Sequence, residues 1–199
     1  MTVSTRPALQ VDDERITTRT HPLTSHTQLL STDILRLLAH HLPDDAYCML
    51  GVTLVDLYPE SSWNFVFGQA SPRDRVGVYS FARYDPTFNG ERGAERQALL
   101  LRRSCKVLAH EMCHLFGMSH CIYFHCLMNG SNHLKESDAR PLHLCPVCLR
   151  KLHLSNQFDV IERLRRLRDV WRKNDYEPEA EWLERRMEYV RGNCSDKST

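Results

Sequence analysis

The stretch HEMCHLFGMSHC, residues 110–121, decides how this chain is interpreted. Two of its histidines, His110 and His114, are four residues apart, so on a helix they lie on the same face, one turn from each other. At that spacing both imidazoles can bind one zinc ion at about 2.0–2.1 Å. Gly117 can adopt the left-handed conformation that ends a helix, which lets the chain turn and bring His120 to a third ligand position. The spacing therefore predicts a three-histidine zinc site with an open fourth position.

Glu111 follows the first histidine and lies beside the expected metal, where it can act on a bound water molecule. Zinc lowers the pKa of such a water to about 7, and Glu111 can accept its proton as a general base. An HExxH pattern arises by chance in about one chain in a hundred of this length, and the further Gly and His make the full motif rarer by a factor on the order of hundreds. The alternative is a solvent-exposed helix without metal. The long motif favours a zinc metallopeptidase, with peptides or proteins as substrates.

Four cysteines in two pairs predict a second zinc site. Cys121 and Cys126 are separated by four residues, and Cys145 and Cys148 by two, a spacing typical of structural zinc. Four thiolates would close the coordination shell, so we expect two zinc ions per chain, one catalytic and one structural. Unligated buried cysteines are the alternative. The remaining cysteines are interpreted as small buried residues or inert surface thiols: Cys48, Cys105, Cys113 and Cys194. Three nearby histidines are interpreted as surface or supporting residues: His125, His133 and His143.

The composition is that of an ordinary globular chain: 199 residues, 42% hydrophobic, 26% charged, with a net charge of +1. This even balance argues against nucleic-acid binding by bulk electrostatics. No stretch approaches the roughly 20 apolar residues that cross a bilayer, and the amino terminus has no apolar signal-peptide region. We therefore expect a monomer in the cytoplasm or nucleus, without membrane or nucleic-acid partners. In a reducing compartment, clustered cysteines bind metal more often than they form disulfides.

Periodicity and turn residues predict an α+β fold. Residues 1–26 carry scattered charge and are expected to be disordered, with an irregular strand at best. They precede a metallopeptidase domain at 27–175 and a short helical extension at 176–199. The expected elements are a helix from residue 31 to Pro43, strands within 47–58, 63–71 and 76–84, a long helix at 95–117, irregular chain at 118–146, and helices at 147–173 and 179–190.

HEMCHLFGMSHC, followed by CLM at 126–128 and CPVC at 145–148, resembles the archaemetzincins. The resemblance covers roughly residues 27–173, and GSNHL at 130–134 is most similar to the second vertebrate paralogue. It implies a compact metzincin-like zincin fold with a mixed sheet, a long active-site helix, a Met-turn and a C-terminal helix. Met128 would be the Met-turn methionine beneath the catalytic zinc. The strand within 76–84 would be the rim against which a peptide substrate pairs.

Two departures accompany the resemblance. Members of the family begin with a β-strand and a helix that precede the helix at residue 31, and residues 1–26 do not convincingly provide that strand. Several other metzincins carry a tyrosine where Asn129 and Gly130 follow the methionine here. Two other functions remain open. A zinc-ribbon-like nucleic-acid module could combine the cysteine pairs with a basic helix, although acidic residues interrupt its basic run: Arg163, Arg165, Arg166, Arg168, Arg172 and Lys173. An intact fold could also serve as a catalytically silent scaffold.

Overall fold

The structure is a computed structural model that describes residues 3–9, 16–90 and 95–195. Contacts divide the chain into two units, Met1–Cys145 and Pro146–Thr199. The sequence predicted boundaries near residues 26 and 175 instead. The side chain of Cys194 lies outside the described part of the chain.

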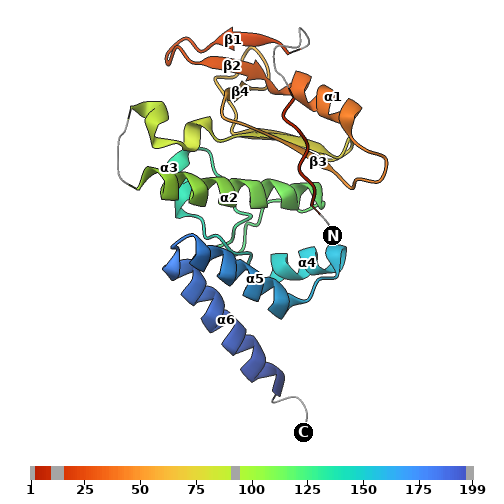
Figure 1. The fold of residues 1–199 in the computed structure, drawn as a ribbon, viewed down its shortest axis with the longest axis vertical. Coiled ribbons are helices and arrows are strands. Elements are labelled where there is room, and N and C mark those ends of the chain that lie inside the picture. Colours follow the sequence, from red (N-terminus) through yellow and green to blue (C-terminus); the bar gives the residue numbers. More distant parts are fainter. Residues whose placement is uncertain (1–2, 10–15, 91–94, 196–199) are drawn as a thin grey trace. The chain divides into compact units, whose positions relative to one another are not determined.

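The first unit contains a three-stranded sheet built from its N-terminal part. Its strands are β1 (Thr18–Thr20), β2 (Thr27–Leu30) and β4 (Asp56–Tyr58), in the order β1-β2-β4. β1 is antiparallel to β2, and β2 is parallel to β4 (Figure 1). The expectation that the chain lacks a strand ahead of the first helix is wrong, because β2 precedes that helix directly and β1 extends the sheet. The short and largely polar sequences TRT and TQLL show too little apolar periodicity to predict strands. The two strands form because their backbones pair in the folded chain.

A second three-stranded sheet has the order β3-β6-β5. β3 (Met49–Thr53) is parallel to β6 (Val76–Ser80), and β5 (Gly68–Ser71) is antiparallel to it. The single strand expected within 47–58 is thus two strands in different sheets, with a turn in which the Val55 amide donates to Thr53 Oγ1 at 3.0 Å. The expected strands within 63–71 and 76–84 are shorter than predicted. β6 is central and paired on both sides, so the prediction that it forms an open rim is wrong.

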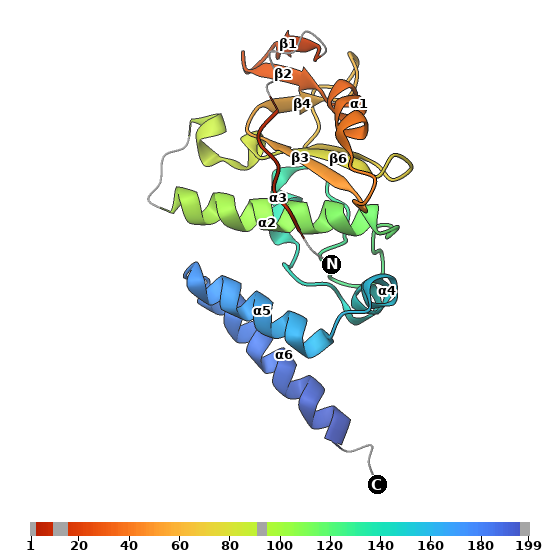
Figure 2. The same cartoon turned by 45° about the vertical axis from the view of Figure 1, so that its right-hand side comes forward.

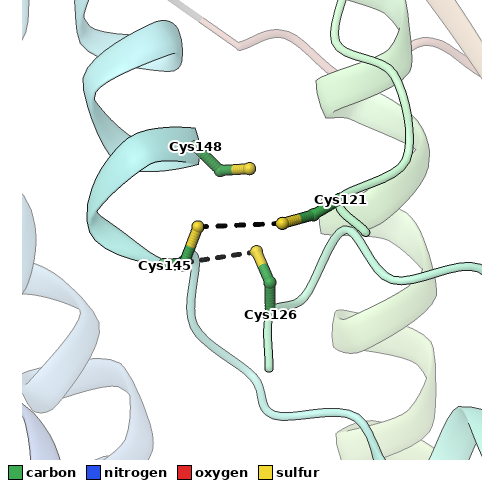
Figure 3. Close-up of side chains that lie close together, drawn as sticks. All are labelled: Cys121, Cys126, Cys145 and Cys148. Carbon is green, nitrogen blue, oxygen red and sulfur yellow. Dashed lines mark hydrogen bonds between the residues drawn. The ribbon is translucent and has the colours of Figure 1, made fainter. Parts of the chain in front are cut away.

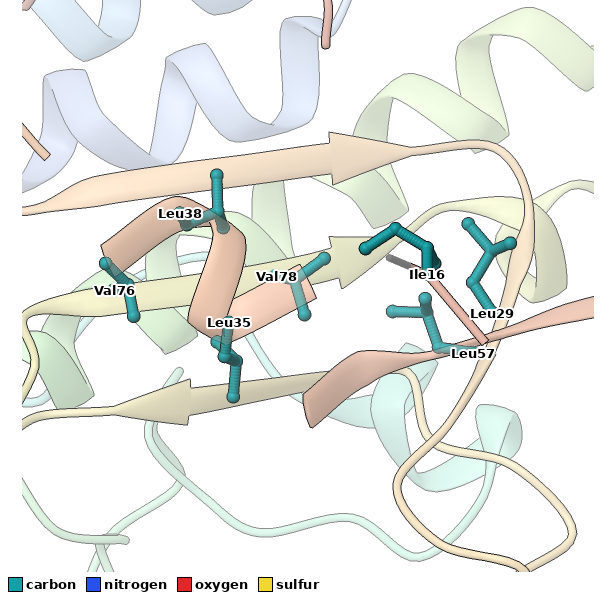
Figure 4. Close-up of a cluster of buried hydrophobic side chains, with 7 residues drawn as sticks. All are labelled: Ile16, Leu29, Leu35, Leu38, Leu57, Val76 and Val78. Carbon is teal, nitrogen blue, oxygen red and sulfur yellow. The ribbon is translucent and has the colours of Figure 1, made fainter. Parts of the chain in front are cut away.

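Helix α1 (Ser31–His41) begins at the predicted residue, ends ahead of Pro43, and packs against β2 and the second sheet. The buried apolar cluster joins both sheets through this helix (Figure 4): Ile16, Leu29, Leu35, Leu38, Leu57, Val76 and Val78. Ile16 belongs to it although it precedes β1. The Thr17 amide also donates to Asp33 Oδ2 at 2.9 Å. The chain just before β1 is therefore held by the core and by the first turn of α1.

Helix α2 (Arg96–Leu115) runs along the second sheet and contacts β5 and β6; Figures 1 and 2 show it below that sheet. The segment after it, expected to be irregular, contains the short helix α3 (Leu134–Ala139). Lys106 of α2 is buried, and its Nζ donates to the carbonyls of Ser137, Asp138 and Arg140 at 3.0, 2.9 and 2.6 Å. A cation at the end of α3 satisfies carbonyls that the helix leaves without partners.

The second unit consists of α4 (Pro146–Asn156), α5 (Val160–Lys173) and α6 (Glu177–Ser195). The single helix expected over 147–173 is broken at Gln157, whose φ is 48°, and Asp159 caps the next helix by accepting from the Glu162 amide at 2.7 Å. α5 and α6 pack on each other. In the described residues, no helix has the length and apolarity that a membrane crossing requires.

Candidate metal centres

The structure brings the three predicted histidines together. His110 and His114 lie on α2, and His120 follows in the loop, with a ring nitrogen of each within 4.8 Å of the others. The Nε2 atoms of His110 and His114 are 3.0 Å apart. The ring centroid of His120 lies 5.2 Å from that of His110 and 4.9 Å from that of His114. His110 is buried and His120 is exposed, so the cluster is reached by solvent from the His120 side.

Backbone carbonyls orient the two helical histidines. His110 Nδ1 lies 2.8 Å from the Leu127 carbonyl, and His114 Nδ1 lies 2.6 Å from that of Met118. A carbonyl only accepts, so in each ring Nδ1 carries the hydrogen and Nε2 has a free lone pair. Two such lone pairs facing each other at 3.0 Å repel unless a cation lies between them. Nitrogens bound to one tetrahedral zinc are about 3.3 Å apart, so the donor set fits this metal.

Gly117 ends α2 in the manner that the motif predicts. Its φ is 79°, in the left-handed region, and its amide donates to the His114 carbonyl at 2.9 Å. The Met118 amide donates to the Cys113 carbonyl at 3.0 Å, which completes a Schellman turn. The same turn presents the Met118 carbonyl to His114. One local motif thus stops the helix and orients a histidine.

Burial sets the protonation of the cluster. Burial lowers the pKa of His110 to about 3, and it also lowers the pKa of His120. Both rings are therefore neutral at neutral pH, as metal ligands must be. Glu111, on α2 beside the cluster, has its pKa raised to about 7 by burial, with the positive charge of Arg140 acting in the opposite direction. A carboxyl that titrates near neutrality suits proton transfer.

The four predicted cysteines also gather, with their Sγ atoms within 4.8 Å of one another (Figure 3). Cys121 and Cys126 lie in the loop after α2, Cys145 ends the first unit, and Cys148 lies in the first turn of α4. The Sγ atoms of Cys121 and Cys145 are 3.9 Å apart, too far for a disulfide. Sulfurs around one tetrahedral zinc are about 3.8 Å apart, so this set also fits the metal.

The chain between the two clusters is tightly bonded. The Cys145 and Met128 amides donate to Cys126 Sγ at 3.2 and 3.4 Å, and the Cys121 amide donates to the Met128 carbonyl at 2.8 Å. Met128 itself is fully buried. Asn129 Nδ2 donates to the Cys121 and Phe124 carbonyls at 2.6 and 2.8 Å. The residue after Met128 thus ties the cysteine loop together where several other metzincins carry a tyrosine.

Sequence reasoning missed Arg140, Lys106 and Gly130, because no motif marks them. The three flanking histidines lie outside both candidate metal groups of the described residues. His125 Nε2 is 3.0 Å from the Ala139 carbonyl, and His133 caps α3 by accepting from the Glu136 amide at 3.3 Å. Cys113 is buried and Cys48 and Cys105 are half-buried, as expected of cysteines without a metal role.

Comparison with known proteins agrees with this geometry. The family model described as Peptidase family M54 matches residues 14–154. Archaemetzincin-2 of Macaca fascicularis is 44% identical to this chain, and the match covers 79% of this chain and 50% of the relative. Archaemetzincin-2 of Homo sapiens is 43% identical, and the match covers 77% of this chain and 49% of the relative. The chain thus spans about half the length of these curated relatives. A zinc-dependent peptidase from Methanocorpusculum labreanum superposes with a TM-score of 0.56 at 29% identity, covering 66% of this chain and 76% of that one. Archaemetzincin from Methanopyrus kandleri superposes with a TM-score of 0.54 at 33% identity, covering 66% of this chain and 67% of that one. The chain belongs to peptidase family M54, the archaemetzincins.

Proposed function

We propose that this chain hydrolyses peptide bonds as a zinc-dependent metallopeptidase, with His110, His114 and His120 as zinc ligands. The observation that carries the proposal is the convergence of three imidazoles beside Glu111, two of which, His110 and His120, have a pKa lowered by burial. Two of the rings are held with Nε2 free for a metal. The similar structure from Methanocorpusculum labreanum is that of a zinc-dependent peptidase, which supports the same activity.

In this proposal Glu111 handles protons and does not bind the metal. When bound, zinc supplies Lewis-acid chemistry, polarising the scissile carbonyl and making the attacking water more acidic. A carboxylate oxygen of Glu111 accepts a proton from that water and later delivers it to the leaving amine nitrogen. Burial raises the pKa of Glu111 to about 7, so the carboxyl can both take up and release a proton near neutral pH.

The proposal includes a second, structural zinc held by Cys121, Cys126, Cys145 and Cys148. Four thiolates leave no open position for a substrate. Cys121 follows His120 directly in the chain. The structural zinc would therefore fix the backbone that presents the third histidine. None of the seven cysteines with described side chains forms a disulfide. We keep a monomer in the cytoplasm or nucleus as part of this proposal.

An edge strand, rather than β6, is where an extended peptide would pair. The order β3-β6-β5 leaves β5 with one unpaired side, and α2, which carries the histidines, contacts β5. Unpaired backbone amides and carbonyls on an edge strand bind extended peptides by adding a strand to the sheet. We therefore place the substrate along β5.

The structure offers little support for a nucleic-acid-binding role. Acidic partners neutralise much of the positive charge on α5. Arg165 and Arg166 pair with Glu162, and Arg172 pairs with Glu184. Arginines engaged in this way make a solvated, ion-paired helix surface rather than a phosphate-binding stripe.

The experiment compares Glu111→Gln and His114→Ala with wild type in peptide-library hydrolysis and in elemental analysis. Glu111→Gln should lower hydrolysis about 10²–10⁴-fold and keep both zinc ions, because it removes only the proton acceptor. His114→Ala should lose one zinc and the activity together. A binding module or a scaffold predicts no hydrolysis in any of the three proteins. Wild-type cleavage rates in a contaminant-free Glu111→Gln preparation would remove Glu111 from its role.

A further inference from the structure

Arg140 follows α3 and is a buried cation, with 6% of its surface exposed. A buried guanidinium needs acceptors for its N–H groups, and among the described residues no carboxylate pairs with it. Its Nη1 donates to the Asn129 carbonyl at 2.8 Å, and its Nη2 donates to Ser137 Oγ at 2.9 Å. The side chain therefore links the end of α3 to the backbone directly after Met128.

That backbone, residues 127–130, supports two of the three candidate zinc ligands. The Leu127 carbonyl lies 2.8 Å from His110 Nδ1 and keeps the hydrogen on that nitrogen. Gly130 lies directly against the His120 ring, since a Cβ there would be 3.2 Å from His120 Nδ1. The Asn129 carbonyl, which Arg140 holds, lies between these two supports in the chain. A shift of this carbonyl would therefore move the groups that orient His110 and His120.

Arg140 is itself anchored to the helix that carries the histidines. Lys106 Nζ donates to the Arg140 carbonyl at 2.6 Å, and Lys106 is four residues before His110, on the same face of α2. Arg140 Nη1 also lies 3.0 Å from His110 Nδ1. With the hydrogen on Nδ1 both nitrogens are donors, so this approach is not a hydrogen bond, and Nη1 donates to the Asn129 carbonyl instead. These hydrogen bonds thus link α2 to Arg140, Arg140 to residues 127–129, and residues 127–129 back to His110 on α2.

We propose that Arg140 is the positioning residue of the histidine site: by holding the Asn129 carbonyl, it fixes residues 127–130 and thereby the orientation of His110 and His120. The inference rests on the proposed function, because it assumes that these histidines bind zinc. In this role Arg140 acts through the backbone and is not itself a metal ligand. Groups that orient metal ligands typically change metal affinity about 10–100-fold when they are removed.

The test measures metal affinity at each site in Arg140→Met, Arg140→Lys and the control Arg103→Met. Arg103 also holds α3, with Nε and Nη2 bonded to Asp138 at 2.9 and 2.6 Å, but it contacts no histidine of the cluster. Zn²⁺ affinity is measured by competition with a chromophoric chelator. Co²⁺ titration separates the sites, because only the cysteine site gives thiolate-to-metal charge-transfer absorption. Thermal midpoints of the metal-free proteins report general loosening.

Arg140→Met should weaken Zn²⁺ binding at the histidine site about 10–100-fold and leave the cysteine site at wild-type affinity. Arg140→Lys, which keeps the charge but not the fork geometry, should weaken it less. Arg103→Met should lower the thermal midpoint with both affinities unchanged. Wild-type affinity in Arg140→Met, or an equal loss in Arg103→Met, would overturn the proposal. If Arg140→Met does not fold, a histidine-site affinity of Arg140→Lys equal to wild type overturns it.

The same titrations distinguish this inference from the proposed function. If wild type binds no metal at the histidine site and His114→Ala changes nothing, the zinc-peptidase proposal fails. If wild type binds and Arg140→Met binds equally well, only the role of Arg140 fails.

Discussion

Gly77 lies on the central strand β6, where the ring of Tyr79 folds back over it. A Cβ at residue 77 would lie 2.2 Å from Tyr79 Oη and 2.8 Å from Cζ, far inside the 3.4 Å at which ordinary contact begins. Tyr79 is fully buried, and β6 is hydrogen-bonded on both sides, so neither can move freely. Gly77→Ala should therefore destabilise the first unit by overpacking.

Overpacking a core costs about 1–3 kcal/mol, and the enclosed position puts Gly77→Ala at about 2–3 kcal/mol. For a chain of this size that corresponds to a thermal midpoint about 4–12 °C lower. Circular dichroism measures the midpoint, and hydrogen exchange of the β6 amides assigns the loss to the first unit. Gly192→Ala in α6 is the matched control, because a Cβ there meets nothing within 4 Å. It should be neutral or stabilising by up to about 1 kcal/mol.

A double-mutant cycle with Tyr79→Phe tests the stated cause. The Tyr79 hydroxyl has no hydrogen-bond partner among the described residues, so Tyr79→Phe alone should be close to neutral. In that background Gly77→Ala loses its shortest contact and should cost less, with a coupling of about 0.5–3 kcal/mol. A Gly77→Ala midpoint equal to wild type, or equal costs in both backgrounds, would refute the overpacking argument.

Three further predictions concern acid stability, the third histidine and the cysteine site. Although burial raises the pKa of Asp33, bonds from Thr17 and then Arg36 bring it below 3.8. This carboxylate therefore contributes stability above about pH 4 that is lost as pH falls through its folded pKa. In denaturant titrations Asp33→Asn should cost about 1 kcal/mol at pH 7 and progressively less as the pH falls below about 4, and a pH-independent difference would contradict this. The added Cβ of Gly130→Ala would contact the His120 ring, so this variant should bind Zn²⁺ more weakly at the histidine site. Chelator competition measures this affinity, and a wild-type value would show that the ring moves aside without cost. Cys145→Ser should leave one zinc per chain by elemental analysis, and a retained second zinc would disprove the four-thiolate site.

The local sequence was sufficient to predict those features that depend only on interactions between neighbouring residues. A helix places residues four apart on one face, so the spacing of His110 and His114 already determined their side-by-side arrangement. Gly117 adopts the left-handed conformation because the helix must end there, and glycine does so without strain. The start of α1 at Ser31 could be predicted because polar residues come directly before the apolar residues that repeat with helical spacing. The two cysteine pairs likewise carry their ligand geometry in their spacing.

Long-range pairing decided the rest. The run 47–58 is mostly apolar, and nothing within it shows that its halves join different sheets, because a strand's sheet is determined by its pairing partners. β1 is polar and forms only through bonds to β2. The place of β6 at the centre of its sheet depends on segments distant in sequence, and so does the edge that we propose for the substrate. Arg140 belongs to no motif, and its proposed role arises from a buried cation that donates to a carbonyl which only the folded chain brings within reach. Sequence alone determined the two candidate metal-binding sets, and the tertiary structure decided which groups hold them in place.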